Sequence, residues 1–459
     1  MQELQDVVSS LADELRVPGV AVGLLHDGRE EYAFHGLTSI ENPLPVDERT
    51  LFLCGSTTKT FTATALMLLV DEGRLELEDP VRTHLPDFRV EDEDAASGVT
   101  VLQLLNHTAG WDGDFFKNTG DGDDALARYV EAMAGLRQLA PPGTAVSYNN
   151  ASFAVVGRLV EKLAGAPYEA ALRTLLLGPL HLEDTLLFSR DLMTRRCAVG
   201  HQRLQDGSAA VQPYGLPRAE NAVGGLATTT RDLIAWARFH LQDGRSVLQQ
   251  MREPTVEAPG WSSGDAVGLS WLLDDVAGLR VAGHGGSMPG QLSLFKMVPE
   301  RDFALAACTN CHPTGGAFNE RLMHWAWATV LDAPIPDPET AARSDDEVQP
   351  FCGTYETVAN IVNVAPHSEG VSLEVVDRPE VLEELGLDPE QEPPIPFLFR
   401  AGDGDRIICP TGDYRGSKGF FVRDGGGQVT AVNAFGRYMP RSTSSSGAAQ
   451  LESPFASST

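Results

Sequence analysis

Ser56 and Lys59 stand three residues apart in the stretch GSTTKTFTATA, which spans residues 55–65. The pattern from Thr58 to Glu72 is helical, and residues three apart lie on one face of a helix. The spacing would place an amine beside a hydroxyl where the helix dipole stabilises negative charge on a bound acyl oxygen. These types suit a serine nucleophile activated by a lysine, whereas the structural alternative is a simple helix cap.

A second Ser-x-x-Lys, formed by Ser293 and Lys296, lies in the alternating stretch QLSLFKMV. Alternation predicts a strand, and positions i and i+3 of a strand point to opposite faces. We therefore expect only the first copy to bring its two side chains together.

Two further motifs could complete such a site. Tyr148 and Asn150 follow the turn PPGTAVS and precede a helical stretch, although a buried tyrosine followed by an Asn cap is the structural alternative. His284 lies in GHGGS beside two glycines that permit a ligand to approach the backbone closely. Its alternative is a tight turn with a surface histidine, which we also predict for His26 in the stretch HDG.

Composition excludes several classes of function. The 459 residues carry 64 Asp and Glu against 35 Lys and Arg, a formal net charge of -29 that disfavours nucleic acids and anionic membranes as partners. The apolar share of 42% is that of a soluble globular protein, and no apolar run approaches the roughly 20 residues that span a bilayer. The acidic first residues lack the pattern of an export signal, so we expect a cytoplasmic protein.

The sequence predicts no metal or organic cofactor. The six cysteines are too scattered for a disulfide framework, and the pair Cys308 and Cys311 follows an apolar run that predicts a strand end rather than a zinc or redox site. The acidic loop from Asp112 to Asp124 lacks the spacing of an EF-hand.

The order of the elements predicts two folding units. Helical stretches near 1–15, 125–139, 151–164, 168–176, 231–242 and 317–331, a hairpin turning at 27–28, and late strands near 265–309 place strands around a mostly helical insert. A proline-rich linker at 334–350 precedes short strand-like pieces at 351–441, which predict a small all-β barrel or sandwich. The tail at 442–459 is of low complexity and is expected to be disordered.

Three ordered elements, Ser56-x-x-Lys59, Tyr148-x-Asn150 and His284-Gly-Gly286, resemble those of the serine β-lactamase-like hydrolases. The resemblance is to the group of class C β-lactamases, D-aminopeptidases and esterases. The stretches LLNHTAG, GPLHLEDT and NAVGGLATTTRDL add to it, so that it covers residues 1 to about 332.

The resemblance implies an α/β (α+β) fold of the β-lactamase and transpeptidase type. An antiparallel sheet with flanking helices would hold an all-helical insert, with the active site at their junction in a hydrolase domain at residues 1–333. Residues 351–441 look like the lipocalin-like barrel of several relatives, which can lend a loop to the active-site cleft.

The resemblance also implies roles for the candidate residues. Ser56 would be the nucleophile, and Lys59 would take its proton if burial lowers the lysine pKa. Tyr148 would share that role and protonate the leaving group, while Asn150 would orient Lys59 and bind substrate. His284 would hold Tyr148 or a substrate carboxylate.

The implied oxyanion hole consists of the backbone N–H groups of Ser56 and Ser287, the residue after Gly286. True β-lactamases carry Lys-Thr-Gly or Lys-Ser-Gly where this chain has His284-Gly-Gly286. Because histidine is mostly neutral at pH 7, efficient β-lactamase activity is disfavoured. The expected lack of export also disfavours a DD-peptidase of the cell wall.

The sequence thus predicts a serine hydrolase that forms an acyl-enzyme on a small amide, a short peptide, including one with D-residues, or an ester. The alternatives are an acyltransferase that passes the same acyl group to an amine or alcohol, and a sensor that is acylated without turnover. The expected partner is a small-molecule or short-peptide substrate, and the sequence is compatible with a homo-oligomer.

Overall fold

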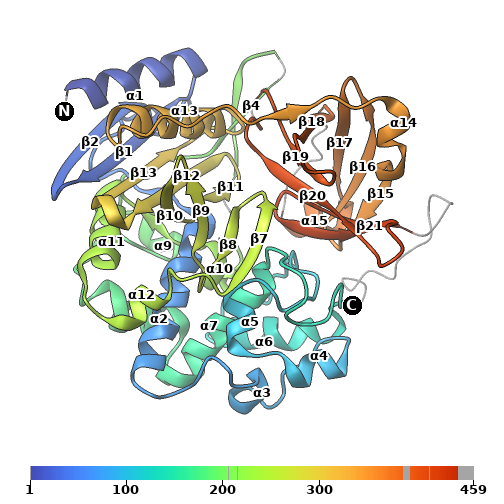
Figure 1. Ribbon diagram of the computed structural model, residues 1–459. Coiled ribbons are helices and arrows are strands. Elements are labelled where there is room, and N and C mark those ends of the chain that lie inside the picture. Colours follow the sequence, from blue (N-terminus) through green and yellow to red (C-terminus); the bar gives the residue numbers. More distant parts are fainter. Residues whose placement is uncertain (1, 205, 214, 386–392, 413, 443–459) are drawn as a thin grey trace.

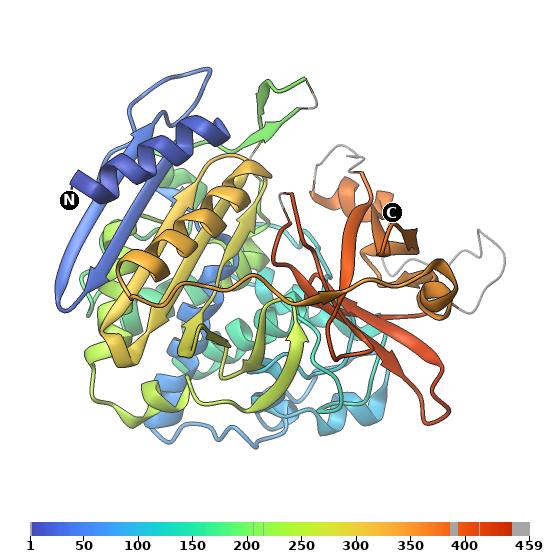
Figure 2. The ribbon, with the colours of Figure 1, turned by 45° about the horizontal axis from the view of Figure 1, so that its top comes forward.

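The computed structural model describes residues 2–204, 206–213, 215–385, 393–412 and 414–442 (Figure 1). Most of the sequence-predicted tail, 443–459, lies outside these residues. The chain forms a large sheet with helices on both faces, a helical lobe beside one end of the sheet, and a C-terminal barrel (Figures 1 and 2).

The large sheet has nine strands in the order β2-β1-β13-β12-β10-β9-β8-β7, with β11 paired to β12, and every pairing is antiparallel. Its first two strands form the expected hairpin, with Asp27 and Gly28 in the turn at φ 49° and 73°. The strands are β1 (Gly19–His26), β2 (Arg29–Gly36), β7 (Val256–Trp261), β8 (Gly264–Val267), β9 (Leu272–Val276), β10 (Leu279–Gly283), β11 (Gly286–Met288), β12 (Gln291–Val298) and β13 (Phe303–Thr309).

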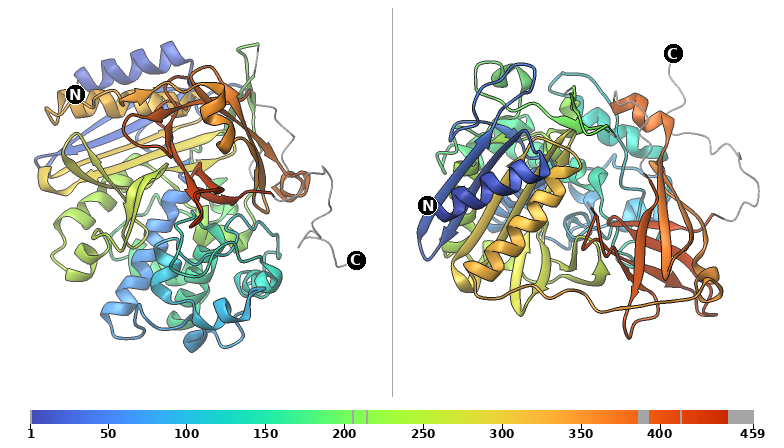
Figure 3. Two further views of the ribbon diagram at one scale, coloured as in Figure 1. Left: turned by 45° about the vertical axis from the view of Figure 1, so that its right-hand side comes forward. Right: turned by 90° about the horizontal axis from the view of Figure 1, so that it is seen from above.

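The two terminal helices of this domain, α1 (Gln2–Leu15) and α13 (Thr314–Thr329), lie side by side on one face of the sheet (Figures 1 and 3). Their apolar residues recur at helical spacing and form one buried cluster with the strands beneath, to which Val8 and Trp327 belong. The helix α11 (Thr230–Gln242) packs against β1 and β13. The sequence-predicted antiparallel sheet with flanking helices is therefore confirmed.

The helical lobe packs against the large sheet. Its central helices α2 and α7 share the main hydrophobic core with the inner face of the sheet. The helices are α2 (Thr58–Asp71), α3 (Val81–His84), α4 (Glu93–Gly98), α5 (Val101–Leu105), α6 (Ala125–Ala132), α7 (Asn150–Ala164), α8 (Tyr168–Leu172), α9 (Ser189–Leu192), α10 (Asn221–Gly224) and α12 (Ser246–Gln250). Two short sheets, β3 (Phe52–Leu53) with β6 (Ala227–Thr228) and β4 (His201–Arg203) with β5 (Ala209–Val211), complete this domain.

Two predicted elements differ in length from those observed. The helix expected at 125–139 is interrupted after Ala132 by the 3-10 turn Met133–Gly135, because Gln138 leaves the helical path to form a bridge with Trp111. The stretch DAVGLSWLLDD, at the start of the region 265–309 and expected to be one of its strands, forms two strands, β8 and β9, since Ser270 adopts a left-handed φ of 71° between them.

The C-terminal strands form a nearly closed eight-stranded antiparallel barrel rather than a sandwich. Neighbours in sequence pair in order from β15 to β22, and a bridge between Tyr355 and Arg441 joins the two ends. The strands are β15 (Gly353–Glu356), β16 (Asn360–His367), β17 (Gly370–Asp377), β18 (Ile395–Arg400), β19 (Arg406–Ile408), β20 (Lys418–Arg423), β21 (Val429–Ala434) and β22 (Arg437–Pro440), with the helix α15 (Pro379–Leu385) between β17 and β18.

The expected linker contains structure of its own. Within 334–350, β14 (Thr340–Ala341) pairs with β18 of the barrel, and α14 (Asp345–Val348) begins at a Ser344 capping box. The proposed domain boundaries stay a prediction. No helix within the described ranges is both long and apolar enough to cross a bilayer.

Candidate active site

Ser56 is placed by a close approach between two backbone segments. It lies in the 3-10 turn Gly55–Thr57 just before α2, opposite β11. A Cβ atom on Gly55 would lie 2.8 Å from Ser287 N, and one on Gly286 would lie 1.9 Å from Cys54 O and 2.7 Å from Ser56 N. Only glycine allows this approach, which brings the backbone nitrogens of Ser56 and Ser287 to the same place.

The Lys59 amine lies against the serine hydroxyl. Lys59 is completely buried, and its Nζ lies 3.0 Å from Ser56 Oγ and 3.0 Å from Val223 O of α10. Burial lowers the pKa of Lys59 well below its usual value, the positive charge of Arg437 adds to this, and Asp114 and Glu220 oppose it. This shift moves the balance toward the neutral amine, which is the form that can accept a proton.

Tyr148 and His284 form a neutral pair in the same site. The Nδ1 atom of His284 lies 2.7 Å from the carbonyl oxygen of Gly285, which can only accept, so Nδ1 carries the proton. Nε2 is then the acceptor for the Tyr148 hydroxyl at 3.4 Å. Burial, followed by the charge of Lys59, lowers the pKa of His284 to about 3, while burial raises that of Tyr148. Both side chains are uncharged near neutral pH.

His107 holds the backbone segment that carries Tyr148. Its carbonyl oxygen accepts from Ser147 N at 2.9 Å, its Nδ1 accepts from Asn149 N at 3.0 Å, and its ring centre lies 4.6 Å from that of Tyr148. Asn149 in turn caps α7 by accepting from Ser152 N at 2.8 Å. The cap that the sequence offered as an alternative thus exists one residue before Asn150, and it fixes where the motif sits.

Asn150 contacts a carboxylate in this structure. Its Nδ2 donates to Asp114 Oδ1 at 2.6 Å, whereas the described residues form no Lys59–Asn150 hydrogen bond of the kind that the resemblance implies. Asp114 is itself held by Arg437, whose Nε and a terminal nitrogen donate to its two oxygens at 2.8 and 3.0 Å. Asn150 can therefore influence Lys59 only through space or through this carboxylate.

Arg437 comes from the barrel, so the barrel contributes a residue to the site. It begins β22, and its guanidinium carbon lies 4.8 Å from the centre of the Tyr148 ring. The preceding Gly436, at φ 81°, accepts through its carbonyl oxygen from Tyr148 N at 2.7 Å and from Trp261 Nε1 at 2.9 Å. The turn between β21 and β22 is thus packed directly against the catalytic tyrosine candidate.

A second contact between the lobe and the barrel uses the neighbouring carboxylate. Asp112 accepts from Val358 N of the barrel at 2.6 Å and from Arg137 at 3.4 Å. Burial raises its pKa to about 6. The acidic loop that lacks EF-hand spacing thus attaches the barrel twice, through Asp112 and Asp114. The described residues contain no cluster of three or more His, Cys, Asp or Glu that could hold a metal.

The second Ser-x-x-Lys does not form a comparable pair. Ser293 Oγ donates to Cys54 O at 2.8 Å and lies 2.9 Å from Thr57 Oγ1, so it fastens the nucleophile turn to β12. Lys296 lies in another environment, near Asp274 and Lys418. All six cysteines are free, and Cys308 lies within β13, next to its end, as expected.

Three residues of the site could not be assigned from the sequence. His107 lies inside the LLNHTAG stretch that carries the resemblance, but its contacts cannot be predicted from that stretch. Asp114 lies in the acidic loop that lacks EF-hand spacing, and Arg437 lies 323 positions after Asp114, in the barrel. No spacing rule can pair residues so distant in the chain.

Comparison with known proteins identifies the family and several relatives of this chain. A family model described as "Beta-lactamase" matches residues 4–326. Penicillin-binding protein 4 of Amycolatopsis lactamdurans is 33% identical over 77% of this chain and 96% of its own length. The structure titled SurE with D-Leu covers 96% of this chain and 99% of its own at 26% identity with a TM-score of 0.72. An octameric penicillin-binding protein homologue from Pyrococcus abyssi shares the fold, with a TM-score of 0.64 at 22% identity over 95% of this chain and 99% of its own.

Proposed function

The chain belongs to the beta-lactamase family of serine hydrolases, and from this premise we propose that Ser56 forms an acyl-enzyme with a small amide whose acyl part carries a D-residue. The observation that carries the proposal is the completely buried Lys59 amine 3.0 Å from Ser56 Oγ. A lysine in that position with a lowered pKa can act as the base that the hydroxyl needs.

Acylation would move protons in turn among Ser56, Lys59, Tyr148 and the leaving group. Ser56 Oγ bonds to the amide carbon as its proton passes to Lys59 Nζ, and the carbonyl oxygen becomes an anion facing the N–H groups of Ser56 and Ser287. The C–N bond then breaks as the Tyr148 hydroxyl gives its proton to the leaving nitrogen, and Lys59 returns a proton to Tyr148. Each well-placed proton transfer contributes about 10²–10⁴-fold to the rate.

Deacylation would use the same groups in reverse. A water molecule gives a proton to the neutral Lys59, directly or through Tyr148, as its oxygen bonds to the acyl carbon. The ester bond to Ser56 breaks, and Oγ regains a proton from Lys59. The products are a free carboxylic acid and the unchanged enzyme.

The preference for a D-residue is supported by one relative and one feature of the site. The SurE structure, at 26% identity, was solved with D-Leu. The neutral His284, with its pKa lowered to about 3, cannot pair with a carboxylate as a lysine would, which disfavours penicillins as good substrates. A D-amino-acid amide or a short peptide with a D-residue meets both conditions.

The test compares the intact protein and the Ser56→Ala variant on D-Leu and L-Leu p-nitroanilides, p-nitrophenyl acetate and a penicillin. We expect the D-anilide to be cleaved faster than the L-anilide, with an acyl adduct on the intact protein seen by mass spectrometry. Turnover and adduct should both vanish in Ser56→Ala. Cleavage that survives in Ser56→Ala would contradict the mechanism, and an L-preference would contradict the substrate class.

The same reactions distinguish the acyltransferase and the sensor. With free D-Leu added as an acceptor, a hydrolase releases the acid, whereas a transferase yields the coupled dipeptide. A stable adduct with one equivalent of p-nitroaniline and no further release would indicate a sensor. The homo-oligomer and the cytoplasmic location stay predictions, and light scattering of the full chain tests the first.

A further inference from the structure

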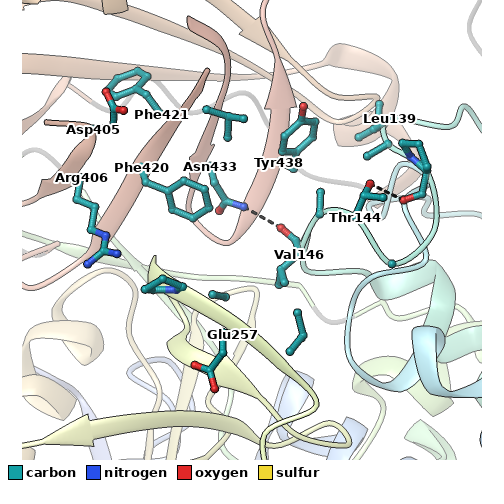
Figure 4. Close-up of a pocket in the computed structure, with 18 of the residues that line it drawn as sticks. Leu139, Thr144, Val146, Glu257, Asp405, Arg406, Phe420, Phe421, Asn433 and Tyr438 are labelled. Carbon is teal, nitrogen blue, oxygen red and sulfur yellow. Dashed lines mark hydrogen bonds between the residues drawn. The ribbon is translucent and has the colours of Figure 1, made fainter. Parts of the chain in front are cut away.

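A cavity outside the nucleophile site lies where the lobe, the sheet and the barrel meet (Figure 4). Its volume is about 620 Å³, within the range of about 300–1,000 Å³ in which proteins bind small molecules. One wall is the segment 139–146 that leads to Tyr148, a second is the start of β7, and the third is the outer face of β20, β21 and β22 with the loop before β19.

Most of the wall is apolar. Val146 and Ala258 come from the hydrolase domain, and Phe420 and Val422 from the barrel. Phe420 alternates with residues that point into the barrel, so its ring covers the outside of the barrel and packs with Val146 and Ala258 in a small cluster. This surface suits an aromatic or branched aliphatic body.

One buried polar atom in the wall has no partner. Asn433 is 1% exposed, and its Nδ2 donates to Val146 O at 2.8 Å (Figure 4). That bond fixes the orientation of the amide group, because a carbonyl oxygen can accept only from the nitrogen. The remaining polar atom of the amide, Oδ1, has no hydrogen-bond partner among the described residues. A buried acceptor without a donor costs free energy, so a ligand N–H or O–H would be stabilised there.

The charged residues around the cavity disfavour anions. Asp403 pairs with Arg406 at 3.0 Å, and Asp405 pairs with Arg423 at 2.8 Å, so these charges are compensated. Glu257 is exposed and takes part in no ion pair among the described residues, which leaves a net negative rim. A fatty acid or another carboxylate would be repelled, whereas a neutral or cationic molecule would not.

We propose that this cavity binds a small apolar molecule with a single N–H donor, of the arylamine or alkylamide class, with the donor on Asn433 Oδ1. The site is separate from the Ser56 centre, and its occupation acts on that centre through two shared segments. Val146 lies two residues before Tyr148, and Asn433 lies on the strand that leads to Gly436 and Arg437.

The hydrogen bonds between these segments explain the coupling. Asn433 binds Val146 O, Tyr438 N donates to Ser147 Oγ at 3.1 Å, and Tyr148 N donates to Gly436 O at 2.7 Å. A ligand that fills the cavity braces the barrel turn against the tyrosine segment. Because it binds the docked arrangement selectively, it shifts the population toward that arrangement and raises the melting temperature.

The first experiment titrates the full chain with N-phenyl-1-naphthylamine, a fluorescent apolar probe with one N–H group. We expect one saturable site per chain and a higher melting temperature. Val422→Trp should fill the cavity and abolish binding, whereas Val376→Trp, at a position 43% exposed on β17 and outside the cavity lining, should leave it intact. Unchanged binding to Val422→Trp would overturn the assignment of the site, as would the absence of binding to the intact protein.

The second experiment tests the donor contact. 1-Benzylnaphthalene has a methylene group in place of the N–H and is measured by displacement of the first probe. The intact protein should prefer the N–H probe by about three- to tenfold, the usual worth of one hydrogen bond. In Asn433→Leu that preference should disappear. Equal affinities in the intact protein would show that Asn433 Oδ1 is satisfied by water alone and would overturn this part of the proposal.

Discussion

The two Ser-x-x-Lys copies of this chain have the same residue types at the same spacing and entirely different outcomes. Ser56 and Lys59 begin a helix, and their side-chain atoms lie 3.0 Å apart. Ser293 and Lys296 lie on β12. Ser293 donates a hydrogen bond to Cys54 O, whereas Lys296 lies near Asp274 and Lys418. Backbone geometry alone separates them, because positions i and i+3 share a face only on a helix.

Burial does not separate the two lysines. It lowers the pKa of both Lys59 and Lys296, but only Lys59 has a serine hydroxyl as a neighbour, whereas Lys296 faces the carboxylate of Asp274. A lowered lysine pKa is thus a weak marker of function unless a nucleophile lies within reach. Substitutions in each of the two copies test this difference.

Replacing the lysines should give the largest contrast. Lys59→Met should lower kcat/KM on a cleaved amide by about 10²–10⁴-fold, because the base for Ser56 is lost. Lys296→Met should leave it within about threefold, since no hydrogen bond joins this side chain to Ser56 or Lys59 among the described residues and, within the site, its charge acts only on His284. Steady-state kinetics with thermal unfolding of both variants measure the difference, and equal losses in two folded variants would contradict the assignment of the base.

Removing the barrel's contribution should have the next largest effect. Arg437→Leu leaves Asp114, which is 5% exposed, without its cation, and breaking a buried pair costs about 3–5 kcal/mol. We expect the lower end of that range, because 27% of the Arg437 side chain is exposed. Activity should fall as well, since Asp114 holds Asn150.

The control is Arg423→Leu, which breaks an exposed pair with Asp405 and should cost at most about 1 kcal/mol. Urea unfolding of the two variants gives the comparison. A stability loss no larger for Arg437→Leu than for Arg423→Leu would show that the barrel turn is not fastened through Asp114.

Below neutral pH, the free energy of unfolding should depend on the ionisation of His284. Its pKa is about 3 in the folded protein and about 6.5 when unfolded, so between these values the unfolded chain binds one more proton. Stability from this residue is therefore lost as the pH falls from 6.5 toward 3, by up to about 1.4 kcal/mol per pH unit. His284→Gln should reduce that slope by as much as one proton.

The matched control is His367→Gln, at an exposed position at the end of β16, which should leave the slope unchanged. Chemical unfolding at several pH values measures both variants. The pH dependence of kcat/KM should show no histidine ionisation near pH 6.5. The loss of kcat/KM at low pH should instead follow protonation of Lys59. A pH profile that shifts in His284→Gln and not in Lys59 variants would contradict this.

The smallest effect is expected at the second serine. Ser293→Ala removes the hydrogen bond to Cys54 O, which keeps Thr57 N as a donor at 3.2 Å. The substitution should therefore destabilise the protein by about 0.5–1.5 kcal/mol, the usual net contribution of one hydrogen bond. The rate should fall less than tenfold, because the turn that carries Ser56 loses one support and keeps its glycine contacts. A loss as large as that of Ser56→Ala would mean that Ser293 itself does chemistry.

Much of the fold and part of the site could be predicted from local pattern. The hairpin at Asp27 and Gly28, the strands at both ends of the hydrolase domain and the helical insert all have periodicity or turn residues within a few positions. The predicted helix at 125–139 was too long, because the bridge of Gln138 to Trp111 is a tertiary contact that no local pattern encodes.

The amino-acid sequence was enough to predict that Ser56 and Lys59 face each other and that Ser293 and Lys296 do not, since both depend on the local backbone. Three other contacts depend on tertiary packing: His107 holds the tyrosine segment, Asp114 accepts from the amide of Asn150, and Arg437 of the barrel donates to Asp114. Contacts and pKa shifts in this site depend on burial between segments separated by more than 300 residues, as Asp114 and Arg437 are. Such burial exists only when the sheet, the lobe and the barrel are packed together.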